Sequence, residues 1–318
     1  MSSPVVVPEE ARDGGRPREW HRPLALGVFL LSAWVVGPVT LAAVPFLLMV
    51  VALPVRKRSA LLVAVLVAFL LAGRTSDDGI HYLELGWALA AGGVFVGLTV
   101  LLPASRVTHR ALGAVTGAGL LAAVGFALRP GSWSAVDWRV RDRLNEEVSQ
   151  ALALFRELQG GEPLPAALRE SVYRSAEMQA ELFPAVLALT TVAGLALAWW
   201  LYGRLALGEL GALAPLREFR FADHLVWVVI AGLALLVLTD GSGWTRAGSN
   251  TLVFMGALYA LRGAGVVLFL SGGPSLLGGL LVALGMLFMA PVLLTAAALI
   301  GLGDTWLDVR TRVRALLT

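Results

Sequence analysis

The strongest constraint in this sequence is a series of apolar runs, each close to the length needed to cross a lipid bilayer. A membrane-spanning helix needs about 20 predominantly apolar residues, because the hydrocarbon core is about 30 Å thick. The stretch 23–54 is too long for one straight helix, and Gly37-Pro38 divides it in two. Seven further runs cover residues 59–73, 85–102, 108–128, 183–203, 224–239, 250–270 and 275–303. The sequence therefore predicts an all-α, polytopic transmembrane helix bundle with about eight spans, in a range of eight to ten.

Composition supports a membrane location and excludes several kinds of chemistry. Of the 318 residues, 58% are hydrophobic and 15% are charged, whereas a soluble domain is about half apolar and about a quarter charged. The sequence has no Cys, which excludes disulfides, thiolate metal sites and thiol catalysis. The phosphate-binding, zinc-protease and serine-hydrolase motifs of soluble enzymes are absent from it as well. We therefore expect no enzymatic activity, no cofactor, no metal site and no nucleic-acid partner.

Basic clusters in the short loops predict which side of the membrane each loop faces. They alternate with an acidic segment, so the positive-inside rule places the N-terminus in the cytoplasm. The C-terminal tail is also basic, so one of the apolar runs must fail to cross the membrane. The candidates are 23–54 and 275–303, whose Ala290-Pro291 centre can kink or split it. We predict that both termini are cytoplasmic. The basic residues are Arg56, Lys57, Arg58, Arg106, Arg110, Arg204, Arg217, Arg220, Arg310, Arg312 and Arg314, and the acidic ones are Asp77, Asp78 and Glu84.

The pattern divides the chain into five segments. Residues 129–182 are polar, and apolar residues recur there at helical spacing, which predicts an extracytoplasmic hairpin of two amphipathic helices. A cap on the membrane domain, a ligand lid and a partner-docking surface all remain open as its role. The hairpin is expected to pack through Val140, Leu144, Val148, Phe155 and Val172. The other segments are a disordered cytoplasmic tail at 1–22, N-terminal membrane helices at 23–128, C-terminal membrane helices at 183–303 and a cytoplasmic amphipathic tail at 304–318.

Arg262 lies deep in the run 250–270 and is the strongest single candidate for a functional residue. A charge in the hydrocarbon core costs at least about 2.5–3.5 kcal/mol and is normally paired inside the bundle. We expect Arg262 to face the bundle interior, where the neighbouring Gly263 and Gly265 leave room for another helix or a ligand. A ligand role and a purely structural pair both remain open. The expected partners are Asp304, Asp308 or backbone carbonyls near Gly263 or Pro291, and the predicted ligand-binding residues are Arg262, Asn250, Asp304 and Asp308.

The end of the last apolar run carries two carboxylates. Asp304 and Asp308 are one helical turn apart and Arg312 follows one turn later, so one continuous helix would place all three on one face. The two carboxylates could bind a cation or pair with Arg262. The alternative is an interfacial helix anchored by Trp306 among the lipid headgroups.

Two pairs of glycines predict close packing of consecutive helices. Gly93 and Gly97 lie four residues apart in one run, and Gly113 and Gly117 have the same spacing in the next. Small residues at this spacing allow two helix backbones to approach closely in a membrane. We therefore expect these two helices to pack through their glycines.

Several stretches resemble one known family. They are the Pro54 and Arg56 boundary after the early helices, Phe219–Trp227 (FRFADHLVW), Asn250, Leu258–Gly263 (LYALRG) and Gly301–Arg310 (GLGDTWLDVR). On these residues, most of which lie in about the last hundred positions, the chain resembles the YybS-like family of predicted bacterial multi-pass membrane proteins, a domain of unknown function. The resemblance implies a multi-pass protein of the bacterial cytoplasmic (inner) membrane. Members of that family more often have Gln where Arg262 stands.

That family is distantly similar to the substrate-binding subunits of energy-coupling-factor transporters, which capture vitamins or metals and dock on a shared transmembrane partner driven by ATPases. The resemblance implies a ligand-binding or transport subunit without its own ATPase, with the lipid bilayer and other membrane-protein subunits as partners. The alternative is a non-transport membrane scaffold or assembly factor that binds partners through its outer hairpin and Arg-rich ends. A transport subunit predicts a polar cavity between the spans, whereas a scaffold predicts a filled bundle.

Overall fold

The computed structural model describes residues 39–72, 79–158, 165–209, 213–239, 243–273 and 276–317. The tail expected at 1–22 and the first half of the stretch 23–54 lie outside the described residues. Contacts between residues divide the chain into two units, residues 1–39 and residues 40–318. All the helices below belong to the second unit.

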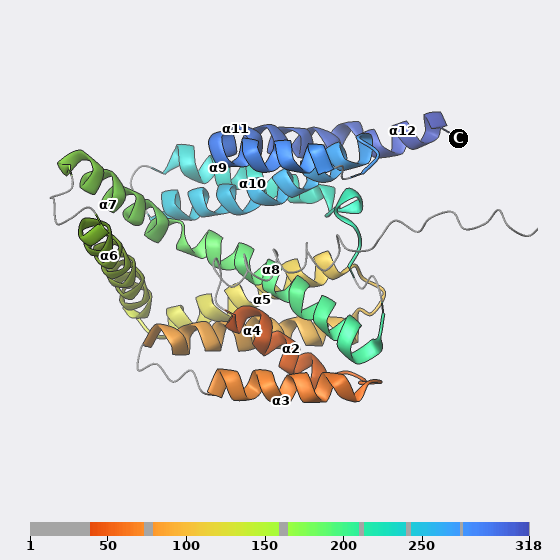
Figure 1. Ribbon diagram of the computed structural model, residues 1–318, viewed down its shortest axis with the longest axis horizontal. Helices are drawn as coiled ribbons and strands as arrows, with labels where there is room; N and C mark the ends of the chain where they lie inside the picture. Colours follow the sequence, from red (N-terminus) through yellow and green to blue (C-terminus); the bar gives the residue numbers. More distant parts are fainter. Residues whose placement is uncertain are drawn as a thin grey trace, which may run out of the picture. The chain divides into compact units, whose positions relative to one another are not determined.

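Every regular element in the described part of the chain is helical (Figure 1). The expected all-α membrane bundle is therefore confirmed. Five of the described helices are long and apolar enough to cross a membrane, namely α4, α5, α8, α10 and α11, and α2, α3 and α9 are shorter apolar helices. The bounds are α2 (Thr40–Ala52), α3 (Arg58–Ala72), α4 (Gly79–Leu101), α5 (Val107–Leu128), α6 (Ser132–Leu158), α7 (Ala166–Glu181), α8 (Phe183–Tyr202), α9 (Val226–Leu238), α10 (Gly243–Leu270), α11 (Leu276–Leu307) and α12 (Val309–Leu317), with short turns η1 (Gly203–Leu207), η2 (Leu216–Glu218) and η3 (Asp223–Leu225).

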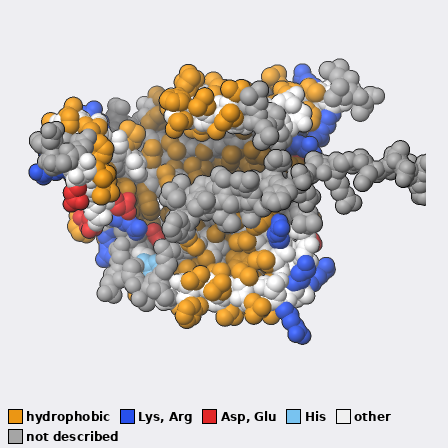
Figure 2. All heavy atoms as spheres, in the orientation of Figure 1, with side chains coloured by type: hydrophobic (Ala, Val, Ile, Leu, Met, Phe, Trp, Pro, Cys, Tyr) orange, Lys and Arg blue, Asp and Glu red, His pale blue; other side chains and the backbone are white. Residues whose placement is uncertain are grey.

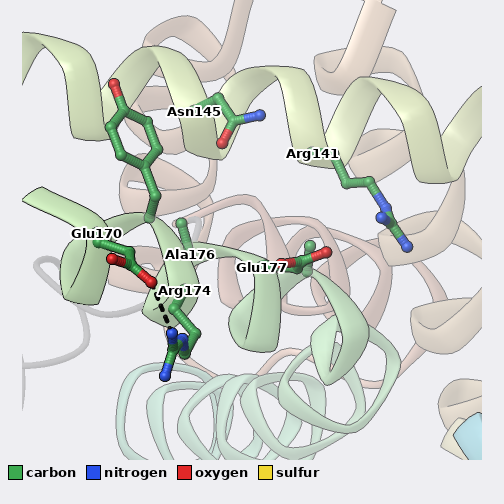
Figure 3. Close-up of a pocket in the computed structure, with 8 residues that line it drawn as sticks. Arg141, Asn145, Glu170, Arg174, Ala176 and Glu177 are labelled. Carbon is green, nitrogen blue, oxygen red and sulfur yellow. Dashed lines mark hydrogen bonds and ion pairs between the residues drawn. The ribbon is translucent and has the colours of Figure 1, made fainter.

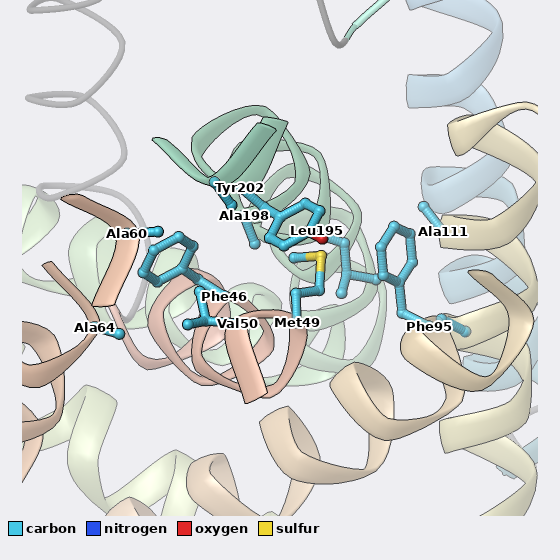
Figure 4. Close-up of a cluster of buried hydrophobic side chains, with 12 residues drawn as sticks. Phe46, Met49, Val50, Ala60, Ala64, Phe95, Ala111, Leu195, Ala198 and Tyr202 are labelled. Carbon is cyan, nitrogen blue, oxygen red and sulfur yellow. The ribbon is translucent and has the colours of Figure 1, made fainter. Parts of the chain in front are cut away.

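One packed core joins α2, α3, α4, α5 and α8. Figure 4 shows its side chains, with Phe46 of α2 beside Ala60 of α3 and Met49 of α2 near Leu195 of α8. Helices in lipid gain little from burying apolar surface, so close packing must hold them together. Gly194 of α8 allows that approach, because a Cβ atom there would lie 2.7 Å from the carbonyl oxygen of Leu41 in α2.

The helices α4 and α5 pack through the glycines of α5 and not through those of α4. Gly113 and Gly117 of α5 do face α4, where a Cβ atom would lie 2.9 Å from Leu98 Cδ1 and 3.0 Å from Val94 Cγ1 respectively. Gly93 and Gly97 of α4 have no heavy atom within 4 Å of a Cβ position, so their predicted role is wrong. The reason is that the glycines of α5 form hollows, and α4 fills them with branched side chains.

The hairpin of α6 and α7 packs through one apolar face and is tied to α10. Val140 is buried and Leu144, Val148 and Val172 are half-buried, as expected. Phe155 is 44% exposed, so its predicted packing, against the hairpin or the membrane surface, stays a prediction. Arg246 of α10 forms an ion pair with Asp137 of α6, with Nη1 and Oδ1 2.7 Å apart. The break before α8 falls at Leu182, and Pro184 stands in the first turn of that helix.

The helix α11 folds back on itself, and it lies in one of the two runs that the sequence indicates as candidates for not crossing the membrane. Its backbone leaves helical geometry at Met289 (φ −134°, ψ 29°), two residues before Pro291. A straight helix would carry Asp304 roughly 42 Å from Leu276, yet Asp304 contacts Arg262, which lies only about 12 Å before the end of α10. The sequence prediction that Ala290-Pro291 breaks this run is confirmed.

The second arm of α11 runs in the same direction as α10. Gly301 lies against Tyr259, Asp304 pairs with Arg262, and further along Arg310 lies close to Gly265. The C-terminal helix α12 therefore emerges at the end of the bundle where α10 ends. Figure 2 shows Lys and Arg side chains gathered at the right-hand end of this unit, with apolar side chains along the flank.

Cysteine labelling tests the direction of insertion, and the absence of natural Cys makes it free of background. Leu158, Arg58 and Ser271 are all exposed. If the basic end faces the cytoplasm, a membrane-impermeant maleimide should label Leu158→Cys in intact cells. It should label Arg58→Cys and Ser271→Cys only after permeabilisation. Labelling of Arg58→Cys in intact cells, with Leu158→Cys protected, would reverse the predicted orientation.

Candidate functional site

Arg262 is buried and fully engaged at the basic end of the bundle. Its side chain is 2% exposed. Nε donates to Asp304 Oδ2 at 3.0 Å, Nη1 donates to Asp223 Oδ1 at 2.7 Å, and Nη2 donates to the carbonyl oxygen of Asp304 at 3.2 Å. The predictions that Arg262 faces the interior and pairs with Asp304 are confirmed. Asp223 is a second partner, which sequence reasoning missed.

Asp304 is the shared acceptor of this cluster. Its side chain has no exposed surface, and the same Oδ2 atom that accepts from Arg262 accepts from Arg310 Nη2 at 2.8 Å. Arg310 also donates to the carbonyl oxygens of Arg217 at 3.2 Å and Phe219 at 3.0 Å. A buried charge needs this kind of pairing to offset the loss of its hydration. The cluster therefore ties α10, α11 and α12 to the segment between α8 and α9.

Two glycines bring the backbones of α10 and α11 into direct contact beside the cluster. A Cβ atom at Gly263 would lie 1.8 Å from the carbonyl oxygen of Ala297, and one at Gly301 would lie 2.0 Å from that of Tyr259. Gly265 similarly faces the carbonyl oxygen of Leu216 at 2.6 Å. Of the two uses expected for the space beside Arg262, the glycines make room for another helix. Because the two backbones touch here, the side chain of Arg262 on α10 can reach that of Asp304 on α11 directly.

The chain turns sharply at Asp308, between α11 and α12. Asp308 has a left-handed backbone (φ 41°), and its side chain pairs with Arg220. A hydrogen bond from the Thr311 side chain, together with Arg220, holds the pKa of Asp308 below its ordinary value. The expectation that Asp304, Asp308 and Arg312 share one face of a continuous helix is wrong. Pairing with Arg262 and Arg310 holds Asp304 inside the bundle, and the chain changes direction at Asp308.

A pocket of about 470 Å³ lies over this cluster. It is surrounded by the first turn of α5, the turn η3 with the residues before it, Arg262 of α10 and the C-terminal end of α11. The Phe221 ring forms part of the wall, 5.5 Å from the Arg262 guanidinium. The remaining lining residues are Arg106, His109, Arg220, Ala222, Asp223, Arg262, Asp304, Thr305 and Asp308. Three of the four predicted ligand-binding residues, Arg262, Asp304 and Asp308, are thus brought together at one pocket.

Asn250, the fourth predicted residue, lies elsewhere and has a different partner set. It precedes Arg262 by twelve positions, or roughly 18 Å along α10. Its Oδ1 accepts from the backbone N–H of Ala185 at 2.8 Å, and its Nδ2 donates to the carbonyl oxygen of Glu181 at 2.8 Å. Asn250 therefore supplies an acceptor to the first turn of α8, where a helix leaves its N–H groups unpaired.

A second pocket, of about 400 Å³, lies between α6 and α7 (Figure 3). Its polar contacts lie at the surface, such as Arg174 Nη2 to Glu170 Oε1 at 2.8 Å within α7 and Ser149 Oγ with Tyr173 Oη at 3.4 Å between α6 and α7. Such surface pairs contribute little to stability and fix no geometry. In the described part of the chain, no group of three or more His, Cys, Asp or Glu side chains is placed to hold a metal ion.

Sequence reasoning missed several lining residues of the main pocket. From the sequence, Arg106 is identified only among the basic loop residues and Asp223 only within the stretch Phe219–Trp227, and His109 is not singled out. Each of these residues lies beside the end of an apolar run. The sequence does not show which run ends meet in space, so no single residue indicated the pocket.

Comparison with known families shows to which family this chain belongs. The family described as "Predicted membrane protein (DUF2232)" matches residues 24–305. This chain belongs to that family. Among curated proteins and among solved structures, the comparisons give no match. The region shared with the DUF2232 family includes Arg262 and Asp304, and the family description agrees with the apolar helix bundle.

The close crossing predicts a large difference between two glycines of α10 in this DUF2232 protein. Gly263→Ala would force a Cβ atom into the backbone of α11, whereas Gly256 has no heavy atom within 4 Å of a Cβ position. Overpacking typically costs about 1–3 kcal/mol, and contact with backbone places Gly263→Ala at the upper end or beyond. Thermal unfolding in lipid nanodiscs should show Gly263→Ala clearly destabilised and Gly256→Ala close to wild type. Equal stability of the two variants would refute the crossing.

Removal of the shared carboxylate is expected to be more damaging than loss of one of its partners. Asp304→Ala leaves two buried guanidinium groups without their common acceptor, and breaking a buried pair in this way costs about 3–5 kcal/mol. Arg262→Gln should cost less, because Arg310 still pairs with Asp304. Unfolding measurements should rank Asp304→Ala below Arg262→Gln, with exposed Arg58→Gln as the unaffected control. If Asp304→Ala unfolds like Arg58→Gln, the cluster does not hold the bundle together.

Proposed function

We propose that this membrane protein binds a small polar molecule in the pocket over the Arg262 cluster, as a ligand-binding or transport subunit without its own ATPase. The observation that carries the proposal is the pocket itself. Its volume of about 470 Å³ falls in the range of roughly 300–1,000 Å³ that is usual for small-molecule sites. A polar cavity at the end of the spans is what a binding subunit requires, and a scaffold has no need of one.

The distribution of charge in the pocket supports binding. Each of its three carboxylates is already paired with a guanidinium, because Asp223 pairs with Arg262, Asp304 pairs with both Arg262 and Arg310, and Asp308 pairs with Arg220. Arg106 and His109 are exposed at the first turn of α5, and no described carboxylate lies within ion-pair distance of either. Positive charge therefore remains on offer to a ligand.

The broken helix α11 supports a role in transport. Discontinuous membrane helices recur at the binding sites of secondary transporters. Here both arms of α11 meet at Met289, and the second arm carries Asp304 into the pocket. Binding without catalysis is the proposed activity, in line with the missing enzyme motifs.

The scaffold alternative draws support from the outer hairpin. Large apolar side chains of α6 and α7 remain exposed there, including Trp138 at 64%, Leu154 at 59% and Met178 at 57%. A membrane-protein partner or the lipid surface could cover them. Under this alternative, the hairpin would select partners and the pocket would be incidental.

Copurification tests the proposal against the alternative. The full chain is extracted from membranes into native nanodiscs, and bound small molecules and proteins are identified by mass spectrometry. A small polar molecule should accompany the wild type and the control Arg58→Gln. It should be lost from the double variant Arg106→Gln and His109→Gln.

Two results would contradict the proposal. The first is that no small molecule accompanies the folded wild-type protein. The second is that the same molecules accompany the wild type and the double variant in equal amounts. If in addition a partner protein is lost on replacing Trp138 and Leu154 by Ser, the scaffold function takes its place.

A further inference from the structure

Asp304, one of the residues that line the pocket, carries a buried acceptor atom that lacks a donor. Asp304 has no exposed side-chain surface, and both guanidinium groups bind its Oδ2 atom. Its other oxygen, Oδ1, has no hydrogen-bond partner among the described residues. A buried, charged acceptor without a donor is costly, so an N–H or O–H group from outside the chain would be strongly favoured at this position.

The mouth of the pocket, at the start of α5, carries positive charge and therefore favours an anion. Arg106 is the N-cap residue of α5, and His109 follows in the first turn of that helix. No acidic residue stands in this first turn to match the positive end of the helix dipole. A cationic side chain and free N–H groups at a helix N-terminus together favour an anion with several acceptor oxygens.

We propose that the pocket takes a small organic anion that also carries a hydroxyl or amine donor. This inference rests on the proposed function and names its ligand class. The anionic group binds at Arg106, His109 and the first turn of α5, while the donor reaches Asp304 Oδ1. A simple anion would make only the contacts with Arg106, His109 and the first turn of α5. A neutral polyol would make only the contact with Asp304 Oδ1.

The same chemistry can come from two sources. One is a free molecule such as glycerol 3-phosphate, and the other is the headgroup of phosphatidylglycerol, which joins a phosphate to a glycerol with free hydroxyls. The pocket lies where the spans end, between α5, α10 and α11, so both sources can reach it.

Three probes separate the two contacts without replacing Asp304, which the bundle needs for stability. Glycerol 3-phosphate carries the anion and the donors, propyl phosphate carries the same anion without hydroxyls, and glycerol carries the donors without the anion. With the full chain in phosphatidylcholine nanodiscs, calorimetry should show glycerol 3-phosphate binding at least ten times more tightly than either of the others. Arg106→Gln should weaken glycerol 3-phosphate at least tenfold, and Arg58→Gln should leave it unchanged.

A second set of nanodiscs, made with phosphatidylglycerol, distinguishes the sources. Unchanged binding of glycerol 3-phosphate there supports a free ligand. The lipid headgroup is the ligand if two results occur together. Glycerol 3-phosphate no longer binds in these nanodiscs, and phosphatidylglycerol is retained by the wild type but released by Arg106→Gln.

Other results would overturn the inference and are distinguishable from failure of the proposed function. If propyl phosphate binds as tightly as glycerol 3-phosphate, the donor contact at Asp304 is wrong, although the pocket still binds ligands. If neither phosphate binds in any lipid while an uncharged molecule copurifies, the anion class is wrong and the proposed function stands. If nothing binds and nothing copurifies, both fail.

Discussion

The carboxylate of Asp304, shared by two buried guanidinium groups, is the interaction on which the C-terminal half of this bundle depends. One oxygen of Asp304 accepts from Arg262 in α10 and from Arg310 in α12. Lipid offers little hydrophobic drive for helix association, so close packing and polar pairs must supply it. Gly263 and Gly301 provide the packing at the same place, because they let the two backbones touch. Neither feature is stable without the other, since the charges would be stranded if the helices separated.

This pairing also determines what the pocket can offer to a ligand. The three carboxylates of the pocket are matched by three guanidinium groups, those of Arg262, Arg310 and Arg220. What remains is positive charge at the mouth, on Arg106 and His109, and one unpaired oxygen of Asp304. The proposed binding function and its ligand class both follow from that division.

Much of the architecture was predictable because membrane physics leaves few choices. The apolar runs predicted the helices, and the cost of a charge in hydrocarbon predicted that Arg262 needs a partner such as Asp304. Proline chemistry predicted the break near Pro291. What the sequence could not reveal depends on contacts across the chain: the partner Asp223 lies in the short turn η3 between two helices, and Asp308, at the turn between α11 and α12, pairs with Arg220. The prediction for the glycines of α4 failed for a similar reason. Their spacing predicts that two helices approach closely, but it does not show which helix supplies the glycines and which supplies the side chains at the contact.

The central claim is that α11 folds back at Met289 and so returns Asp304 to Arg262. The distance between spin labels at Ser271→Cys and Leu307→Cys, measured by pulsed electron paramagnetic resonance in nanodiscs, tests it most directly, because the chain has no other Cys. Both positions are exposed. The folded-back helix places both labels at the same end of the bundle and predicts a separation below about 30 Å, whereas a straight α11 would separate them by about 45 Å or more. A distribution centred at the longer distance would contradict the account.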